Sequence, residues 1–98
     1  MATHSLLTIP VKPGKEEAFV ATFHRLDVFG HAAAVPAFRG GHLLRPRDGS
    51  GEFVVHAEWD GPEGYQAWLD APVRAELTAE LDGLLDGEPS GRLYDDRS

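Results

Sequence analysis

Residues 51–72, GEFVVHAEWDGPEGYQAWLDAP, contain both tryptophans of the chain. Polar and apolar side chains alternate over 52–59, as they do in a half-buried strand, and the alternation ends at Trp59. An acid, a glycine and a proline follow, and apolar residues then recur with helical spacing through Trp68. Asp60 and the glutamate three residues later have the spacing of a capping box, so we expect a helix to begin there. The stretch therefore predicts a strand that runs directly into a helix, with an indole on each side of the corner.

The rest of the chain predicts one α+β domain over residues 1–98. The helix that precedes the hairpin is expected to stop at Gly30, and the turn DGSG joins the second strand to the third. The expected elements are strands at 3–11, 40–47, 52–59 and 92–95, a helix at 15–29 with a short helical turn at 31–35, and a helix at 60–84 that is interrupted near 71–72. This order is that of the ferredoxin-like, split βαβ fold.

Composition excludes several classes of function. The absence of cysteine excludes disulfides, thiolate metal sites and a cysteine nucleophile. The net charge of -7 comes mostly from acids after residue 57, and these would repel a phosphate backbone, so we expect no nucleic-acid partner. No apolar segment approaches the about 20 residues that span a bilayer, and nothing is typical of a signal peptide. We therefore expect no membrane partner and a cytoplasmic location.

Two histidines are predicted to face each other across the hairpin. If its loop is formed by residues 48–50, His42 lies opposite His56, and Arg45 lies opposite Phe53 on the other face. His42 and His56, with Glu58 two residues along, could be metal ligands, but the tight spacing of structural sites is missing and we expect no metal. They could also be hydrogen-bonded histidines of the core, polar residues that line a cavity, or a general base.

Aromatic residues gather around the strand-to-helix corner. Tyr65 and Trp68 are three residues apart and share one face of the predicted helix. With Trp59 and Phe23 they either fill the space between helices and sheet or line a cleft in it. Such a cleft, with His24 at its border, would suit a flat and hydrophobic aromatic ligand.

Residues 35–72, VPAFRGGHLLRPRDGSGEFVVHAEWDGPEGYQAWLDAP, resemble the antibiotic biosynthesis monooxygenase (ABM) family. The resembling features are a proline and phenylalanine before the second strand, a glycine-rich hairpin, a strand that ends on tryptophan, and a Y-x-x-W helix. The resemblance implies a homodimer in which two ferredoxin-like subunits close into a dimeric α+β barrel, with the last strand, near Arg92–Asp95, against the partner. It also implies a cleft between sheet and helices in which an aromatic polyketide is oxidised by O₂, with no metal, flavin or haem.

The residues of the family carry over unevenly. Trp59 matches the tryptophan that ends the third strand in the quinone-forming members, but the asparagine four residues earlier is Val55 here, and the chain has no asparagine. Trp68 matches a tryptophan of the haem-degrading members. Their iron-binding histidine is Thr78 here, so the resemblance does not extend to haem degradation.

Three functions remain open from the sequence. The first is a cofactor-independent monooxygenase with O₂ as co-substrate, the second is a related cyclase or isomerase with a histidine base, and the third is a non-catalytic dimeric module that binds a small hydrophobic ligand or a partner protein. The predicted catalytic residues are His56, Trp59 and His42, and the predicted substrate-binding residues are Phe23, His24, Arg45, Tyr65 and Trp68.

Overall fold

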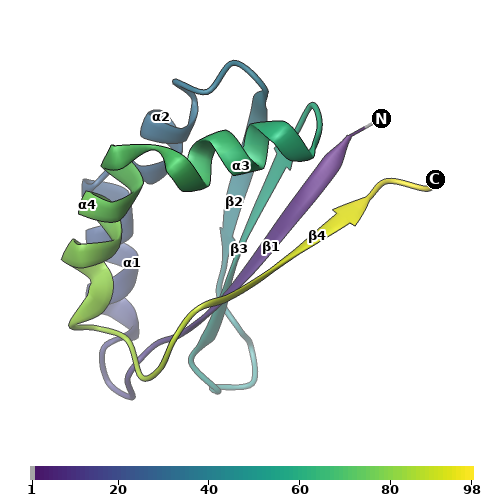
Figure 1. The fold of residues 1–98 in the computed structure, drawn as a ribbon. Coiled ribbons are helices and arrows are strands. Elements are labelled where there is room, and N and C mark those ends of the chain that lie inside the picture. Colours follow the sequence, from purple (N-terminus) through teal and green to yellow (C-terminus); the bar gives the residue numbers. More distant parts are fainter. Residues whose placement is uncertain (1) are drawn as a thin grey trace.

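A computed structural model describes residues 2–98 of the chain. Its elements are β1 (Thr3–Pro10), α1 (Glu16–Arg25), α2 (Val28–Ala32), β2 (Phe38–Leu44), β3 (Glu52–Trp59), α3 (Pro62–Asp70), α4 (Pro72–Asp82) and β4 (Ser90–Asp95). The strands form one sheet in the order β2-β3-β1-β4, and every neighbouring pair is antiparallel. The helices of residues 2–98 all lie on one side of this sheet, and its other side carries none of them (Figure 1). The predicted ferredoxin-like α+β fold is confirmed.

The hairpin has the predicted register. His42 pairs with His56 and Leu43 with Val55. Near the start of β2 the register shifts between Phe38 and Gly40, so that Phe38 faces Trp59 instead of following the alternation of the strand. A bulge turns a side chain to the other face of a sheet. Here it brings the Phe38 ring to the helix-covered face, where its centroid lies 5.1 Å from that of Trp59.

The helix predicted at 15–29 is two helices. α1 ends at Arg25, Asp27 adopts a left-handed backbone conformation with φ 51°, and α2 then includes Gly30, which was expected to stop the helix. In a continuous helix, about 100° of rotation per residue would have carried Phe29 away from the face that holds Phe23. The break instead brings these two rings to 5.4 Å from each other between helices and sheet.

The start of α3 also differs from the prediction. Its N-cap is Gly61, and no side chain caps the helix. The Asp60 carboxylate accepts a hydrogen bond from Arg39 instead, and its backbone N–H donates to the carbonyl of Ala37 at 2.9 Å. α3 ends at Asp70 and α4 begins at Pro72, which confirms the predicted interruption. Pro72 is tolerated because it occupies the first turn of the second helix.

Candidate functional site

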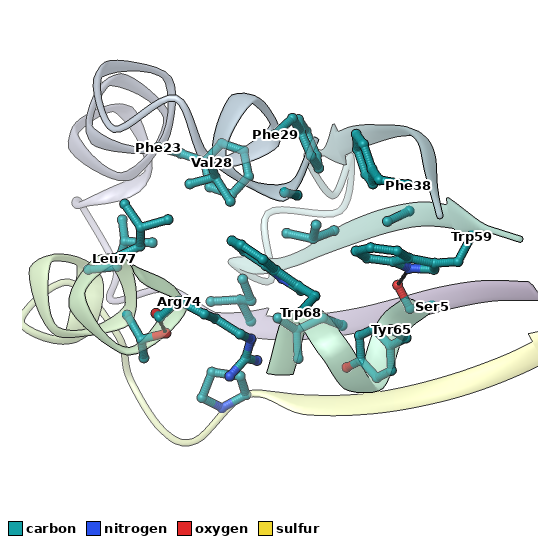
Figure 2. A pocket seen from close by; sticks show the side chains of 18 of the residues that line it. Ser5, Phe23, Val28, Phe29, Phe38, Trp59, Tyr65, Trp68, Arg74 and Leu77 are labelled. Carbon is teal, nitrogen blue, oxygen red and sulfur yellow. Dashed lines mark hydrogen bonds between the residues drawn. The ribbon is translucent and has the colours of Figure 1, made fainter. Parts of the chain in front are cut away.

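A cavity of about 110 Å³ lies between the sheet and the helices. β1 and β3 form its floor, and residues of all four helices form its walls (Figure 2). Most of the lining is aliphatic or aromatic. Among the described residues, no carboxylate and no imidazole lines it. Its chemistry is therefore that of an apolar pocket with few polar groups.

The inner end of the cavity is built around Trp59, whose side chain is 1% exposed. The Tyr65 ring lies 5.9 Å from it in an edge-on arrangement. Gly64 lets α3 approach this indole closely, because a Cβ there would lie 2.6 Å from the Cβ of Ala37 and 3.4 Å from Cε3 of Trp59. The indole N–H of Trp59 donates a hydrogen bond of 3.0 Å to the hydroxyl oxygen of Ser5 (Figure 2). The corner of strand and helix is thus both a packed wall and a source of hydrogen-bonding groups.

The outer end of the cavity is formed mainly by α4 and the preceding helix. Trp68 is 8% exposed and covers the middle of the cavity, whereas Arg74 is half-buried and Thr78 is exposed, so that the opening lies beside α4. The Thr78 hydroxyl donates to the carbonyl oxygen of Arg74 at 2.8 Å. Arg74 is the only formally charged residue in the described lining, and it makes no ion pair within residues 2–98.

The structure brings four of the predicted site residues together. Trp59, Phe23, Tyr65 and Trp68 all line the cavity, each from a different part of the chain or a different turn of helix. The spacing of Tyr65 and Trp68 on one helix face, and the place of Trp59 at the strand's end, were sufficient to group them. Their roles in binding or catalysis stay predictions.

The other four predicted residues do not line the cavity. His42 and His56 lie on the helix-free face, because alternate residues of β3 from Val55 to Trp59 face the helices and His56 falls between them. His24 is exposed on α1, next to buried Phe23. Arg45 is exposed beyond the end of β2, where its guanidinium lies against Glu17 and 5.9 Å above the Phe53 ring. Catalytic or binding roles for these four at this cavity are not supported by their positions.

Three histidines form a row across the helix-free face, one on each of β1, β3 and β2. Nδ1 of His4 lies 2.8 Å from Nε2 of His56 in a ring-to-ring hydrogen bond, and the His42 ring is 6.2 Å from that of His56. Burial lowers the pKa of His56, the positive charges of His4 and His42 lower it further, and Glu58 acts in the opposite direction. Within residues 2–98 no group of three potential ligands is placed to hold a metal ion.

Two polar residues of the lining, Ser5 and Arg74, were not among the predicted site residues, although each has a signal in the sequence. Ser5 lies two residues from Leu7 and four from buried Ile9 on β1, so the period of two places it on the core face. Arg74 precedes Leu77 by three residues on the apolar stripe of α4, which places it on the same helix face. Polar residues in an otherwise apolar stripe are the signal that could have found both.

Comparison with known proteins identifies the family of this chain. A model of the family described as "Antibiotic biosynthesis monooxygenase" matches residues 4–80. A variant of SnoaB, described as a cofactor-independent oxygenase from Streptomyces nogalater, is 24% identical, with a TM-score of 0.80 over 99% of this chain and 94% of the other. A proposed antibiotic biosynthesis monooxygenase from Bordetella bronchiseptica is 14% identical, with a TM-score of 0.85 over 97% of this chain and 96% of the other. No similar protein is found among curated proteins.

The solved structures establish likeness of fold, because their sequence identities are low. Proteins of the matching family are typically dimers. No helix within residues 2–98 combines the length and the apolar composition needed to cross a bilayer.

Proposed function

Because the chain belongs to the antibiotic biosynthesis monooxygenase family, we propose that it is a cofactor-independent monooxygenase that oxidises an aromatic small molecule in the cavity between sheet and helices. The observation that carries this proposal is the cavity itself. It is apolar and walled by aromatic rings, and its inner end holds the buried hydrogen-bonded pair Trp59 and Ser5. Such a site excludes water and strengthens the few polar contacts made inside it. SnoaB, which has the same fold, is described as an oxygenase of this kind.

The proposed reaction requires that the substrate supply the electrons. The CH₂ group between the two aromatic rings of an anthrone, activated by the conjugated carbonyl, would become a ketone: R₂CH₂ + O₂ → R₂C=O + H₂O, with one oxygen atom retained in the product and the other leaving as water. The ring CH para to the hydroxyl of a phenol or naphthol would become a quinone carbonyl with the same balance. The substrate must first lose a proton to become electron-rich. Since neither a carboxylate nor an imidazole of the described residues lines the cavity, we infer that suitable substrates ionise readily near neutral pH.

The size of the cavity favours a small ring system. A cavity of roughly 150 Å³ is sufficient to bind benzene in an engineered protein core, and the cavity here measures about 110 Å³. The enclosed part of a ligand is therefore at most about one aromatic ring. Larger substituents would extend past Trp68 to the opening beside Arg74, or would require these side chains to move.

A second candidate function is non-catalytic binding of the same class of ligand. It is favoured by the absence of a carboxylate or imidazole from the described lining and by Val55, which occupies the place of the family's asparagine. A cyclase or isomerase that uses a histidine base has less support, because His42 and His56, the two predicted catalytic histidines, face the other side of the sheet.

Oxygen uptake separates these functions. We would supply phenols, naphthols and anthrones in air, and repeat each reaction with EDTA and under argon. Uptake that survives EDTA, with ¹⁸O from ¹⁸O₂ in the ketone product, is the expected result. Binding of these compounds without uptake would favour the non-catalytic function, and product formed under argon would favour a cyclase or isomerase.

A pair of variants tests whether the reaction takes place in this cavity. Ala57→Leu adds bulk to its floor and should lower the rate of oxygen uptake by at least about tenfold, while overpacking costs about 1–3 kcal/mol of stability. Ala75→Leu adds the same bulk at an exposed position of α4 and should leave the rate unchanged. Equal rates in the two folded variants would place the reaction elsewhere.

A further inference from the structure

The hydrogen bond between Trp59 and Ser5 leaves the hydroxyl hydrogen of Ser5 unused at the inner end of the cavity. Ser5 is 4% exposed on β1, and it lines the cavity from the floor. Its oxygen accepts the indole N–H of Trp59 at 3.0 Å (Figure 2). Indole is a donor only, whereas a hydroxyl group is both donor and acceptor. The hydroxyl hydrogen of Ser5 is therefore not used in this bond.

No acceptor for this hydrogen is found among the described residues. Within residues 2–98, the Ser5 side chain makes one hydrogen bond, which it accepts from Trp59. Thr78 carries the other aliphatic hydroxyl of the lining. This hydroxyl lies at the opening and donates to the carbonyl oxygen of Arg74. A buried donor without an acceptor is costly, and a ligand atom is the natural partner where the donor faces a cavity.

We propose that Ser5 is the hydrogen-bond donor that binds an acceptor oxygen of the ligand, either a ring-conjugated carbonyl or a phenolate. The proposal deepens the proposed function, since it names the chemical group that the inner end of the cavity recognises. Trp59 is a positioning residue. By donating to the Ser5 oxygen it occupies one lone pair, and it thereby restricts the directions in which the O–H can point.

This geometry has a consequence for the chemistry. When the CH₂ group beside a carbonyl loses its proton, negative charge moves to the carbonyl oxygen. A donor already held against that oxygen stabilises the charge as it forms, in a site from which water is excluded. Ser5 would thus favour ionisation of the substrate without itself removing the proton.

Binding of a matched pair of ligands tests the proposal. Acetophenone and ethylbenzene have similar size, and only the first has an acceptor oxygen. We expect wild-type protein to bind acetophenone more tightly, and Ser5→Ala to weaken acetophenone binding about tenfold with ethylbenzene unchanged, which corresponds to about one hydrogen bond. Thr22→Val removes a hydroxyl from α1, outside the lining of the cavity, and should change neither affinity.

A measurement on the wild-type protein keeps the test independent of how the variants fold. The carbonyl stretching band of bound ¹³C-labelled acetophenone should shift to lower frequency than in an apolar solvent, and Trp59→Phe should broaden this band. An unshifted band, or equal affinities of wild-type protein for the two ligands, would overturn the proposal for Ser5 even if oxygen uptake occurs. A carbonyl preference without oxygen uptake would leave the proposal for Ser5 standing and count against the monooxygenase.

Discussion

Trp59 is the residue on which both the core and the candidate site depend. Its indole is 1% exposed, packs against Phe38, and donates a buried hydrogen bond to Ser5. Trp59→Phe removes part of the packed volume and leaves the Ser5 oxygen without its donor, so we expect a loss of about 2–3 kcal/mol in the free energy of unfolding. Urea denaturation measures this loss. Trp68→Phe is the control, because Trp68 is 8% exposed and makes no side-chain hydrogen bond among the described residues. An equal loss in both variants would contradict the importance given to the hydrogen bond.

His56 makes the stability of the protein depend on pH. Burial, then the charges of His4 and His42, lower its pKa in the folded state, from an ordinary value of 6.5. The unfolded chain therefore takes up the proton first as the pH falls. The stability that His56 contributes is complete above about pH 6.5 and is lost as the pH falls through the folded-state pKa.

Melting temperatures at pH 7.5 and pH 5.5 test this dependence. We expect His56→Gln to melt with a smaller difference between the two pH values than the wild-type protein. The charged groups around the histidine row include Glu58, which pairs with Arg39 at 3.4 Å and acts to raise the pKa of His56, and Asp96, whose carboxylate lies 3.9 Å from Nε2 of His4. His31→Gln, at an exposed position of α2, should retain the wild-type difference. A His56→Gln protein with an unchanged difference would show that other groups govern it.

At the scale of elements, α3 depends on a glycine to reach the sheet. Alanine normally stabilises a helix relative to glycine. In Gly64→Ala, however, the new Cβ would lie 2.6 Å from the Cβ of Ala37 and press on Trp59, so we expect a loss of about 1–3 kcal/mol. Gly83→Ala at the end of α4 meets no atom within 4 Å and has a helical φ of -65°, so it should be neutral or stabilise by up to about 1 kcal/mol. Thermal unfolding of the two variants should show opposite signs, and a stabilised Gly64→Ala would contradict the close packing of α3.

α4 places the one charged side chain of the described lining at the opening of the cavity. A ligand with an anionic group at its outer end should therefore gain affinity from Arg74. We expect Arg74→Met to weaken binding of 4-acetylbenzoate about fivefold and to leave acetophenone unchanged, as a half-exposed charge pair contributes about 1 kcal/mol. Titration calorimetry at low and high salt measures both effects, and Arg25→Met at an exposed position is the control. Equal losses for the charged and the neutral ligand would show that Arg74 acts by packing alone.

At the scale of the whole molecule, the sequence predicted the fold better than the site. The order of elements and the hairpin register follow from local patterns, since the period of a strand and the chemistry of a turn are set by neighbouring residues. The break at Asp27 and the pairing of Asp60 with Arg39 do not, because both depend on contacts that form only after the helices meet the sheet.

The site shows the same limit more sharply. The sequence correctly predicted that Trp59 and Trp68 lie together, because large aromatic side chains at a strand-to-helix corner are buried between the sheet and the helix. The histidines were assigned to the cavity by their chemistry, although the alternation of β3 places His56 on the face opposite Trp59. The positions of Ser5 and Arg74 in apolar stripes could be read from the sequence, but the roles proposed for them depend on what the rest of the cavity lacks, which no single stretch of sequence reveals.

The helix-free face of the sheet leads to a prediction about assembly. Proteins of this family are typically dimers, and we propose that this chain forms a homodimer through that face (Figure 1). Val54 lies on this face, where it pairs with Thr8 on one side and with Leu44, 48% exposed, on the other. Covering this face would bury exposed apolar surface and the histidine row together.

Val54→Arg tests the interface, because it would place two uncompensated charges where the two sheets meet. Light scattering after gel filtration should give twice the chain mass of 10.7 kDa for the wild-type protein and the chain mass itself for Val54→Arg. Ala21→Arg adds the same charge to an exposed position of α1 and should remain dimeric. A monomeric wild-type protein, or a Val54→Arg protein that stays dimeric, would contradict an interface on this face.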